Sequence, residues 1–218
     1  LNIVITGANR GIGLELTRRY AKDNHVYALC RQSSTELNLL PNVTVIDECD
    51  VSSTDSIIRA TSLCPPTIDI LINNAGILRR VSLESLNEDL IYKQFDINAV
   101  GPLRVTNAFL NSLKKDSKII LITSRMGSID DNSSGSHYGY RMSKAALNMA
   151  GKSMAIDLNS QGICVGIIHP GWVKTDMTGQ TGHYSVDVAA EQIISRIDEL
   201  NMSNSGSFWH SDGSELPW

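Results

Sequence analysis

The stretch Asn2-Ile3-Val4-Ile5-Thr6-Gly7-Ala8-Asn9-Arg10-Gly11-Ile12-Gly13 decides the fold of this chain. Its first residues are a short apolar run, typical of a strand, and an amphipathic pattern suited to a helix follows Gly13. A strand, a glycine-rich turn and a helix bring backbone N–H groups and the positive end of the helix to a pyrophosphate. Glycines can also serve only to make a turn tight. Their place directly after the first strand favours a dinucleotide site.

The second predicted strand, residues 25–29, bears on which dinucleotide would bind. A carboxylate about twenty residues past the glycines would accept the ribose hydroxyl of NAD. This region has no acid and contains Arg31, while Arg10 lies in the glycine turn. Two guanidinium groups converging on the adenosine ribose suit a 2′-phosphate. We therefore predict NADP(H) as the cofactor; the alternative is that one or both arginines point into water.

Strands and helices alternate along the rest of the chain. The pattern predicts helices over residues 52–63, capped by Ser52, over 87–113, kinked at Gly101-Pro102, from about Tyr138 to 160, and over 186–200. Further strands are predicted at residues 43–49, 68–72, 118–123, 163–168 and 207–209. This alternation predicts an α/β, doubly wound, Rossmann-type three-layer sandwich with a central, mostly parallel seven-stranded sheet. We expect one domain over residues 1–218, with the substrate pocket formed by its C-terminal half.

Composition narrows the classes of partner. The chain has 218 residues, a net charge of -4 and a pI near 5.7, which give no reason to expect nucleic acid or an anionic membrane. Its apolar runs are too short to span a bilayer, and no basic-then-apolar leader opens it. The four cysteines are scattered without metal-like spacing, so buried reduced thiols and no metal site are expected. These features predict a cytoplasmic protein.

Tyr140 and Lys144 are the candidate acid/base pair. Side chains four residues apart leave the same face of a helix, and of the six tyrosines only Tyr140 has lysine at that spacing. A nearby ammonium favours the phenolate and is expected to lower the pKa of the phenol. The same spacing also occurs by chance on solvated helices.

Several polar segments coincide with the carboxyl ends of predicted strands. In open parallel sheets the ligand binds at that edge. The glycine turn, residues 73–76, Ser124 and residues 170–175 all fall there. This coincidence predicts one ligand site assembled from the whole length of the chain.

At this point the chain resembles the short-chain dehydrogenase/reductase family over essentially its full length. The resemblance rests on Thr6-Gly7-x-x-x-Gly11-Ile12-Gly13, Asn73-Asn74-Ala75-Gly76, Asn98, Ser124, Tyr140-x-x-x-Lys144 and Pro170-Gly171. Within the family, the sequence around Tyr140, the run from His169 to Met177 and the ending Asp212-Gly213-Ser214-Glu215-Leu216-Pro217-Trp218 are similar to sniffer-type carbonyl reductases and bacterial C-factor-like proteins.

The resemblance implies a four-part catalytic site. Tyr140 would give a proton to a carbonyl oxygen, or take one from an alcohol, while Lys144 would lower the Tyr140 pKa and hold the nicotinamide ribose. Ser124 would donate to the substrate oxygen, and Asn98 would position a relay water. The implied cofactor contacts are Gly7, Asn9, Arg10, Gly11, Ile12, Gly13, Arg31, Asp50, Val51, Asn74, Ala75, Gly76, Tyr140, Lys144, Pro170, Gly171, Val173 and Thr175.

Other interpretations stay open at this stage. Asn73 and Asn74 would equally well brace the sheet, Asn98 would serve as a kink residue, and Ser124 as a cap. The resemblance implies reduction of a small-molecule carbonyl, but alcohol oxidation uses the same residues, and C-factor-like proteins suggest a signalling or scaffold role. It also implies a homodimer through the two long helices. Two departures are a protruding loop over residues 128–136 and a short segment between Thr175 and Val186.

Overall fold

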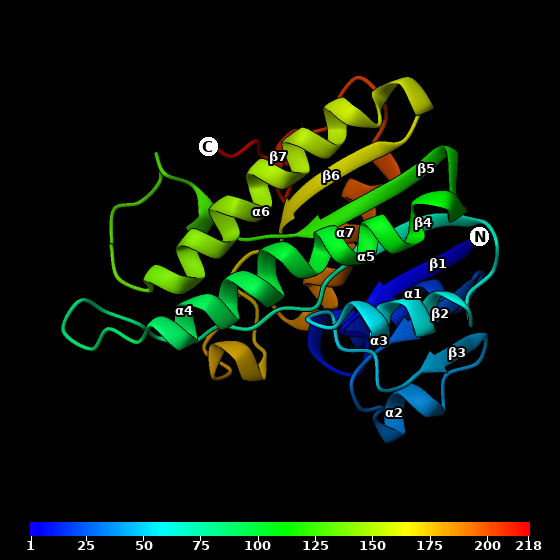
Figure 1. Cartoon of the computed structure of the whole chain (residues 1–218), viewed down its shortest axis with the longest axis horizontal. Helices are drawn as coiled ribbons and strands as arrows, with labels where there is room; N and C mark the ends of the chain where they lie inside the picture. Colours follow the sequence, from blue (N-terminus) through cyan, green and yellow to red (C-terminus); the bar gives the residue numbers. More distant parts are fainter.

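The computed structural model describes all residues, Leu1–Trp218, around one central sheet. Its seven strands are all parallel and lie in the order β3-β2-β1-β4-β5-β6-β7 (Figure 1). The order reverses between β1 and β4, which is where a doubly wound sheet opens a crevice. The predicted Rossmann-type architecture is confirmed. The strands are β1 (Asn2–Thr6), β2 (His25–Leu29), β3 (Val43–Ile46), β4 (Ile68–Asn73), β5 (Leu113–Ile122), β6 (Cys164–His169) and β7 (Phe208–His210).

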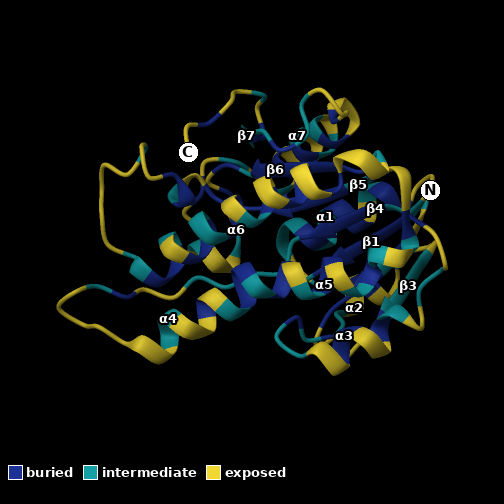
Figure 2. Ribbon diagram, turned by 45° about the horizontal axis from the view of Figure 1, so that its top comes forward, coloured by how far each residue is buried: buried dark blue, intermediate teal, exposed yellow.

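Helices cover both faces of the sheet because its strands are apolar on both sides. On β1, Ile3 and Ile5 enter one apolar cluster and Val4 enters the other, as the alternation of a strand requires. Figure 2 shows the buried sheet between exposed helix faces. One cluster includes residues of α3 (Thr54–Thr61), α5 (Gly101–Phe109) and α6 (Tyr138–Asp157), and the other includes residues of α1 (Gly11–Tyr20), α2 (Thr35–Asn38) and α7 (Val186–Glu199). Helix α4 (Glu88–Phe95) has no residue in either cluster and packs against α6.

Two local predictions near β3 were wrong. The strand ends at Ile46, before Glu48 takes a left-handed conformation with φ of 57°. Ser53, not Ser52, caps α3, because the Ser52 hydroxyl and amide are bound to the Asp50 carboxylate. The short helix α2, capped by Ser34, was not predicted. Helices of about one turn carry too little periodicity to be recognised.

The long predicted helix before β5 changes its winding, but not where expected. A π-helical segment, Asp96–Val100, joins α4 to α5, and Pro102 lies in the first turn of α5. Proline has no N–H to donate to the carbonyl of Asn98, four residues earlier. The irregularity is therefore centred on Asn98 rather than on Gly101, and the cause is the same proline.

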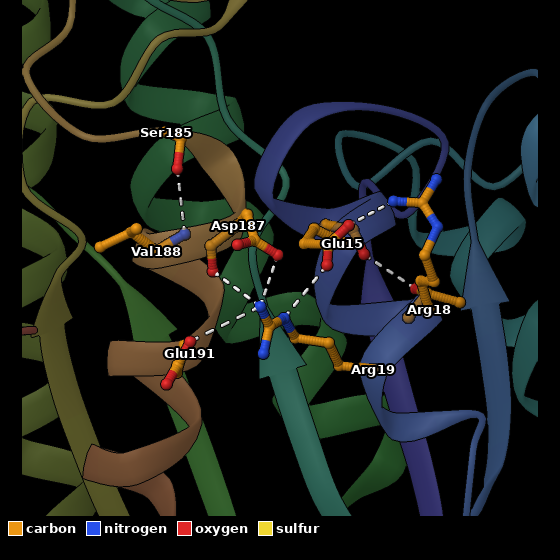
Figure 3. A network of polar contacts seen from close by, with 9 residues as sticks. Glu15, Arg18, Arg19, Ser185, Asp187, Val188 and Glu191 are labelled. Carbon is orange, nitrogen blue, oxygen red and sulfur yellow. Dashed lines mark hydrogen bonds and ion pairs between the residues drawn. The ribbon is translucent and has the colours of Figure 1, made fainter.

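Helices α1 and α7 are joined by a charged network (Figure 3). The Arg19 guanidinium lies 2.5 Å from Asp187 Oδ1, 3.1 Å from Glu15 Oε1 and 3.7 Å from Glu191 Oε2. Ser185 caps α7 by accepting a hydrogen bond from the Val188 amide. The network therefore holds the start of α7, where the segment that follows β6 ends.

None of the helices is long and apolar enough to cross a membrane.

Candidate active site

A cavity of about 730 Å³ lies at the carboxyl ends of the strands. It is lined by segments from both halves of the chain, as the coincidence of strand ends predicted. The predicted residues that line it are Gly7, Asn9, Arg10, Gly11, Ile12, Gly13, Arg31, Asp50, Val51, Asn74, Ala75, Gly76, Tyr140, Lys144, Pro170 and Thr175. Four predicted residues are not part of this lining: Asn98, Ser124, Gly171 and Val173.

The backbone of the glycine turn packs so closely that a side chain at Gly13 has no room. A Cβ atom on Gly13 would lie 2.2 Å from the Gly7 carbonyl oxygen, and Gly7 has φ of +66°. The Asn74 amide donates to the carbonyls of Thr6 (3.0 Å) and Gly7 (3.1 Å). In return, the Thr6 hydroxyl accepts the backbone amides of Asn74 and Ala75, each at 3.1 Å. Asn74 therefore braces the ends of β1 and β4 and also lines the cavity, while its contact with a cofactor stays a prediction.

The far end of the cavity carries Arg31, which is exposed and pairs with no carboxylate. Beside it, burial tends to raise the pKa of Asp50, but hydrogen bonds from Ser52 and the charge of Arg31 outweigh burial and lower it. The Asn9 amide donates to the Gln32 carbonyl at 2.8 Å and ties the glycine turn to the end of β2. A single free guanidinium at this position fits a phosphate on the ribose.

Arg10 does not join Arg31, contrary to the prediction that the two converge. Its Nη1 lies 3.2 Å from Asp176 Oδ2, with both side chains mostly exposed. Thr175 packs against the glycine turn, since its methyl group lies 3.5 Å from where a Cβ atom on Gly11 would stand. This contact brings the next residue, Asp176, close to Arg10. Opposite charges brought together across the cavity pair with each other. The pair bridges the glycine turn and the segment after β6.

Tyr140 and Lys144 leave the same buried face of α6, as their spacing predicted. Burial raises the pKa of Tyr140 to about 12, although a hydrogen bond with Ser124 acts in the opposite direction. Burial also lowers the pKa of Lys144 to about 8. The Lys144 ammonium donates to the Ile122 carbonyl at 2.9 Å and lies 5.8 Å from the centre of the Tyr140 ring. The expected lowering of the Tyr140 pKa is wrong for this structure, because desolvation of the phenolate outweighs the other influences.

Ser124 lies behind Tyr140 rather than on the cavity wall. Its hydroxyl is buried, hydrogen-bonds Tyr140 and also accepts the Met126 amide at 3.1 Å. Ser124 is therefore both a partner of the phenol and a cap of the turn after β5. The cap that the sequence allowed is therefore present, and donation from Ser124 to a substrate oxygen stays a prediction.

Asn98 is fully buried and joins the loop after β4 to α6. Its amide oxygen accepts the Ile77 amide at 2.8 Å, and its Nδ2 donates to the Ile77 carbonyl (2.9 Å) and to Ser143 Oγ (3.0 Å). Ser143 in turn donates to the Tyr140 carbonyl at 2.8 Å. The side chain of Asn98 thus holds the wall of the cavity against the helix of Tyr140, while Pro102 cannot donate the usual i+4 hydrogen bond to the Asn98 carbonyl.

The sequence analysis did not predict all the residues that line the cavity. Ile122 and Thr123 were detectable, because they directly precede Ser124 at the end of a strand. Lys174, Met177 and Gln180 lie in a segment closed on itself by backbone hydrogen bonds from His183 and Tyr184 to Trp172 and from Lys174 to Tyr184. That closure depends on contacts no local pattern records. The other unpredicted lining residues are Leu29, Cys30, Gln32, Cys49, Ile77, Ile97, Asp176 and Val186.

Sequence relatives of the chain include a Rhodococcus enzyme and a Myxococcus protein. It is 35% identical over 224 residues, 99% of each chain, to 1-hydroxy-2-glutathionyl-2-methyl-3-butene dehydrogenase of Rhodococcus sp. (strain AD45). It is 43% identical over 162 residues to C-signal of Myxococcus xanthus, which covers 73% of this chain and 98% of that protein. The predicted likeness to C-factor-like proteins is confirmed.

Solved structures that share the whole architecture include two carbonyl reductases. The NADPH-bound carbonyl reductase from chicken fatty liver superimposes with a TM-score of 0.91 at 30% identity, covering 100% of this chain and 98% of that one. The carbonyl reductase Sniffer of D. melanogaster gives a TM-score of 0.91 at 29% identity, covering 100% and 99%. The predicted likeness to sniffer-type reductases is confirmed. A family model described as short chain dehydrogenase matches residues 1–185, and the protein is therefore an oxidoreductase of the short chain dehydrogenase family.

Proposed function

We propose that the protein reduces the carbonyl of a ketone, aldehyde or quinone with NADPH, and that Tyr140 supplies the proton. The observation that carries this proposal is the buried group of Ser124, Tyr140 and Lys144 beside the cavity. A phenol with a pKa of about 12 is protonated at neutral pH, which is the state that a proton donor needs. A protein that only bound a dinucleotide would have no use for this group.

The residues present fit NADP(H). Gly7, Gly11 and Gly13 leave the turn open to a pyrophosphate, and Arg31 is free to take a 2′-phosphate. The NADPH-bound chicken enzyme supports this choice. When bound, the nicotinamide supplies the hydride.

The chain's own residues would act on the proton. Ser124 orients the Tyr140 hydroxyl through their hydrogen bond, and Tyr140 holds the proton at its phenolic oxygen. Lys144 lies on the same face of α6 and would replace the proton from solvent through a water on the Asn98 carbonyl. Asn98 also fixes Ile77, which lines the cavity. Positioning of the substrate and transfer of the proton are thus assigned to different side chains.

The test is NADPH oxidation with a panel of quinones, diketones and aromatic aldehydes, comparing wild type with Tyr140→Phe. We expect the variant to lose about 10²- to 10⁴-fold in kcat, the usual contribution of a general acid, with the affinity for NADPH kept. Undiminished turnover in Tyr140→Phe would refute the mechanism.

Two alternatives have specific support. The Rhodococcus relative is named a dehydrogenase, which favours alcohol oxidation with the same residues. The identity to C-signal supports a cofactor-binding signalling or scaffold role with little turnover. Tight NADPH binding, with no reduction of any carbonyl in the panel and no oxidation of the corresponding alcohols by NADP⁺, would favour the second of these.

We also propose a homodimer through α4, α5 and α6. Their outer faces expose apolar side chains at Tyr92 (67%), Leu103 (42%), Met149 (68%) and Ile156 (67%). Apolar positions on neighbouring helices are typical of interfaces when they form a continuous patch. Light scattering tests this proposal, and a monomer at high concentration would contradict it. A cytoplasmic location stays a prediction.

A further inference from the structure

The arginines of this chain divide into two groups by their partners. Seven of the eleven pair with a carboxylate: Arg10, Arg18, Arg19, Arg59, Arg104, Arg125 and Arg196. Four pair with none: Arg31, Arg79, Arg80 and Arg141. Arg31 lines the cofactor end of the cavity. The other three, here called the mouth arginines, lie outside the cavity lining, on the two segments that flank Tyr140.

Backbone hydrogen bonds bring the mouth arginines together. Arg79 and Arg80 follow Ile77, which lines the cavity, and the Tyr138 amide donates to the Val81 carbonyl at 3.2 Å. That bond places Val81, the residue after Arg80, against Tyr138, which begins α6 and precedes Tyr140 by two residues. Arg141 directly follows Tyr140. The trio therefore flanks the proton donor from two segments that are distant in sequence.

Arg141 is held in place without losing its charge. Its guanidinium donates to the Gly135 carbonyl (3.0 Å), to Ser134 Oγ (2.8 Å) and to the Met126 carbonyl (3.4 Å), all of them neutral. The side chain is only partly exposed. Neutral acceptors orient a cation but do not neutralise it, so its field persists at the surface.

The neighbouring groups show that this charge is uncompensated. Burial lowers the pKa of His137, and the charges of Arg80 and Arg141 lower it further. Within the same segments Asp131 is taken by Arg125. The remaining carboxylates there, Glu84 and Asp130, pair with none of the trio. In a protein whose net charge is -4, this is a local concentration of free positive charge.

We infer that the substrate carries a carboxylate, which the mouth arginines hold while its carbonyl lies at Tyr140. Arginine presents a planar fork of donors that matches a carboxylate. Arg80 has no hydrogen bond of its own and is free to reach the ligand, while Arg141 supplies a fixed charge. The inference rests on the proposed carbonyl reduction and specifies its substrate class.

The test compares two aldehydes that differ only in charge, 4-carboxybenzaldehyde and methyl 4-formylbenzoate. Wild type should prefer the acid in kcat/KM, and this preference should decline with added salt because exposed charges are screened. Arg80→Gln should lower the acid-to-ester ratio about tenfold, mainly through the KM of the acid. Lys22→Gln, which removes one exposed cation at the opposite end of the sheet, is the matched control and should keep the wild-type ratio.

A binding measurement separates this inference from the proposed function. Terephthalate, which no hydride transfer can alter, should shift the NMR titration of His137 to higher pH, because a nearby anion favours the imidazolium. Arg80→Gln should remove that shift. Reduction of both aldehydes with equal efficiency by wild type, or a His137 titration unmoved by terephthalate, would overturn the inference. Failure to reduce either aldehyde while His137 still responds would instead count against the reductase proposal and support the anion site.

Discussion

The proposed cofactor side and the proposed substrate side of the cavity are built in different ways. On the cofactor side, strand ends β1 and β4 are joined by Thr6 and Asn74, and glycines contact backbone atoms with no room to spare. Around the proposed substrate side, segments 77–87, 128–136 and 174–185 carry exposed apolar residues such as Leu83 (73%) and Ile129 (82%). The left of Figure 1 shows the first two of these segments extending beyond the sheet.

This contrast indicates where the protein tolerates changes in its amino-acid sequence. A pyrophosphate is the same in every dinucleotide, so a turn that binds it is fixed by sterics. A substrate differs from one relative to another, and loops on a rigid scaffold accommodate such differences. Four experiments challenge or refine this comparison.

The largest effect is expected from adding one methyl group to a glycine on each side. Gly13→Ala would place Cβ 2.2 Å from the Gly7 oxygen, so we expect a loss of about 3 kcal/mol in unfolding free energy. Gly135→Ala meets nothing within 4 Å and should cost only about 1 kcal/mol, from its φ of +61°. Urea unfolding measures both. Equal losses would show that the two sides are equally constrained.

The buried ammonium of Lys144 should make stability depend on pH. Its pKa is about 8 in the folded protein and 10.5 when unperturbed, so the cost of burying the charge is fully present below pH 8. Relative to Lys144→Met, wild type should gain roughly 3 kcal/mol as the pH rises from 8 to 10.5. Urea unfolding at several pH values tests this. Lys152→Met, on the exposed side of the same helix, is the control, and a similar pH trend there would assign the effect to general charge.

Arg31 should set the choice between NADPH and NADH. Loss of a charge-assisted hydrogen bond of about 1.5–3 kcal/mol predicts that Arg31→Asp reduces the preference for NADPH roughly 10- to 100-fold. Dissociation constants for both dinucleotides measure it. Arg59→Asp makes the same charge change on α3 and should leave the preference intact. A wild-type preference in Arg31→Asp would remove the argument for NADP(H).

The smallest effect is expected at the ion pair that bridges the two sides. Arg10 and Asp176 are 60% and 68% exposed, and such pairs contribute less than about 1 kcal/mol. Asp176→Asn should therefore change the dissociation rate of NADPH by less than about fivefold in stopped flow. A much larger change would mean that the pair closes the cavity over the cofactor.

Local patterns determined much of this protein. The strand–turn–helix at the start, the alternation of elements and the i, i+4 spacing of Tyr140 and Lys144 each depend on residues close in sequence, and the structure agrees with them. The lining of the cavity could be predicted in outline for the same reason, because parallel strands all end at one edge.

Only the tertiary structure decided how those residues interact. Arg10 turned to Asp176, which is 166 residues away, and burial raised the pKa of Tyr140 where the sequence suggested the opposite. Asn98 and Ser124 do not line the cavity but hydrogen-bond two residues that do, Ile77 and Tyr140. Charge pairing and desolvation depend on distance and packing in space. Sequence spacing therefore determined which side chains point in the same direction. Folding determined which of them contact one another and which are buried away from water.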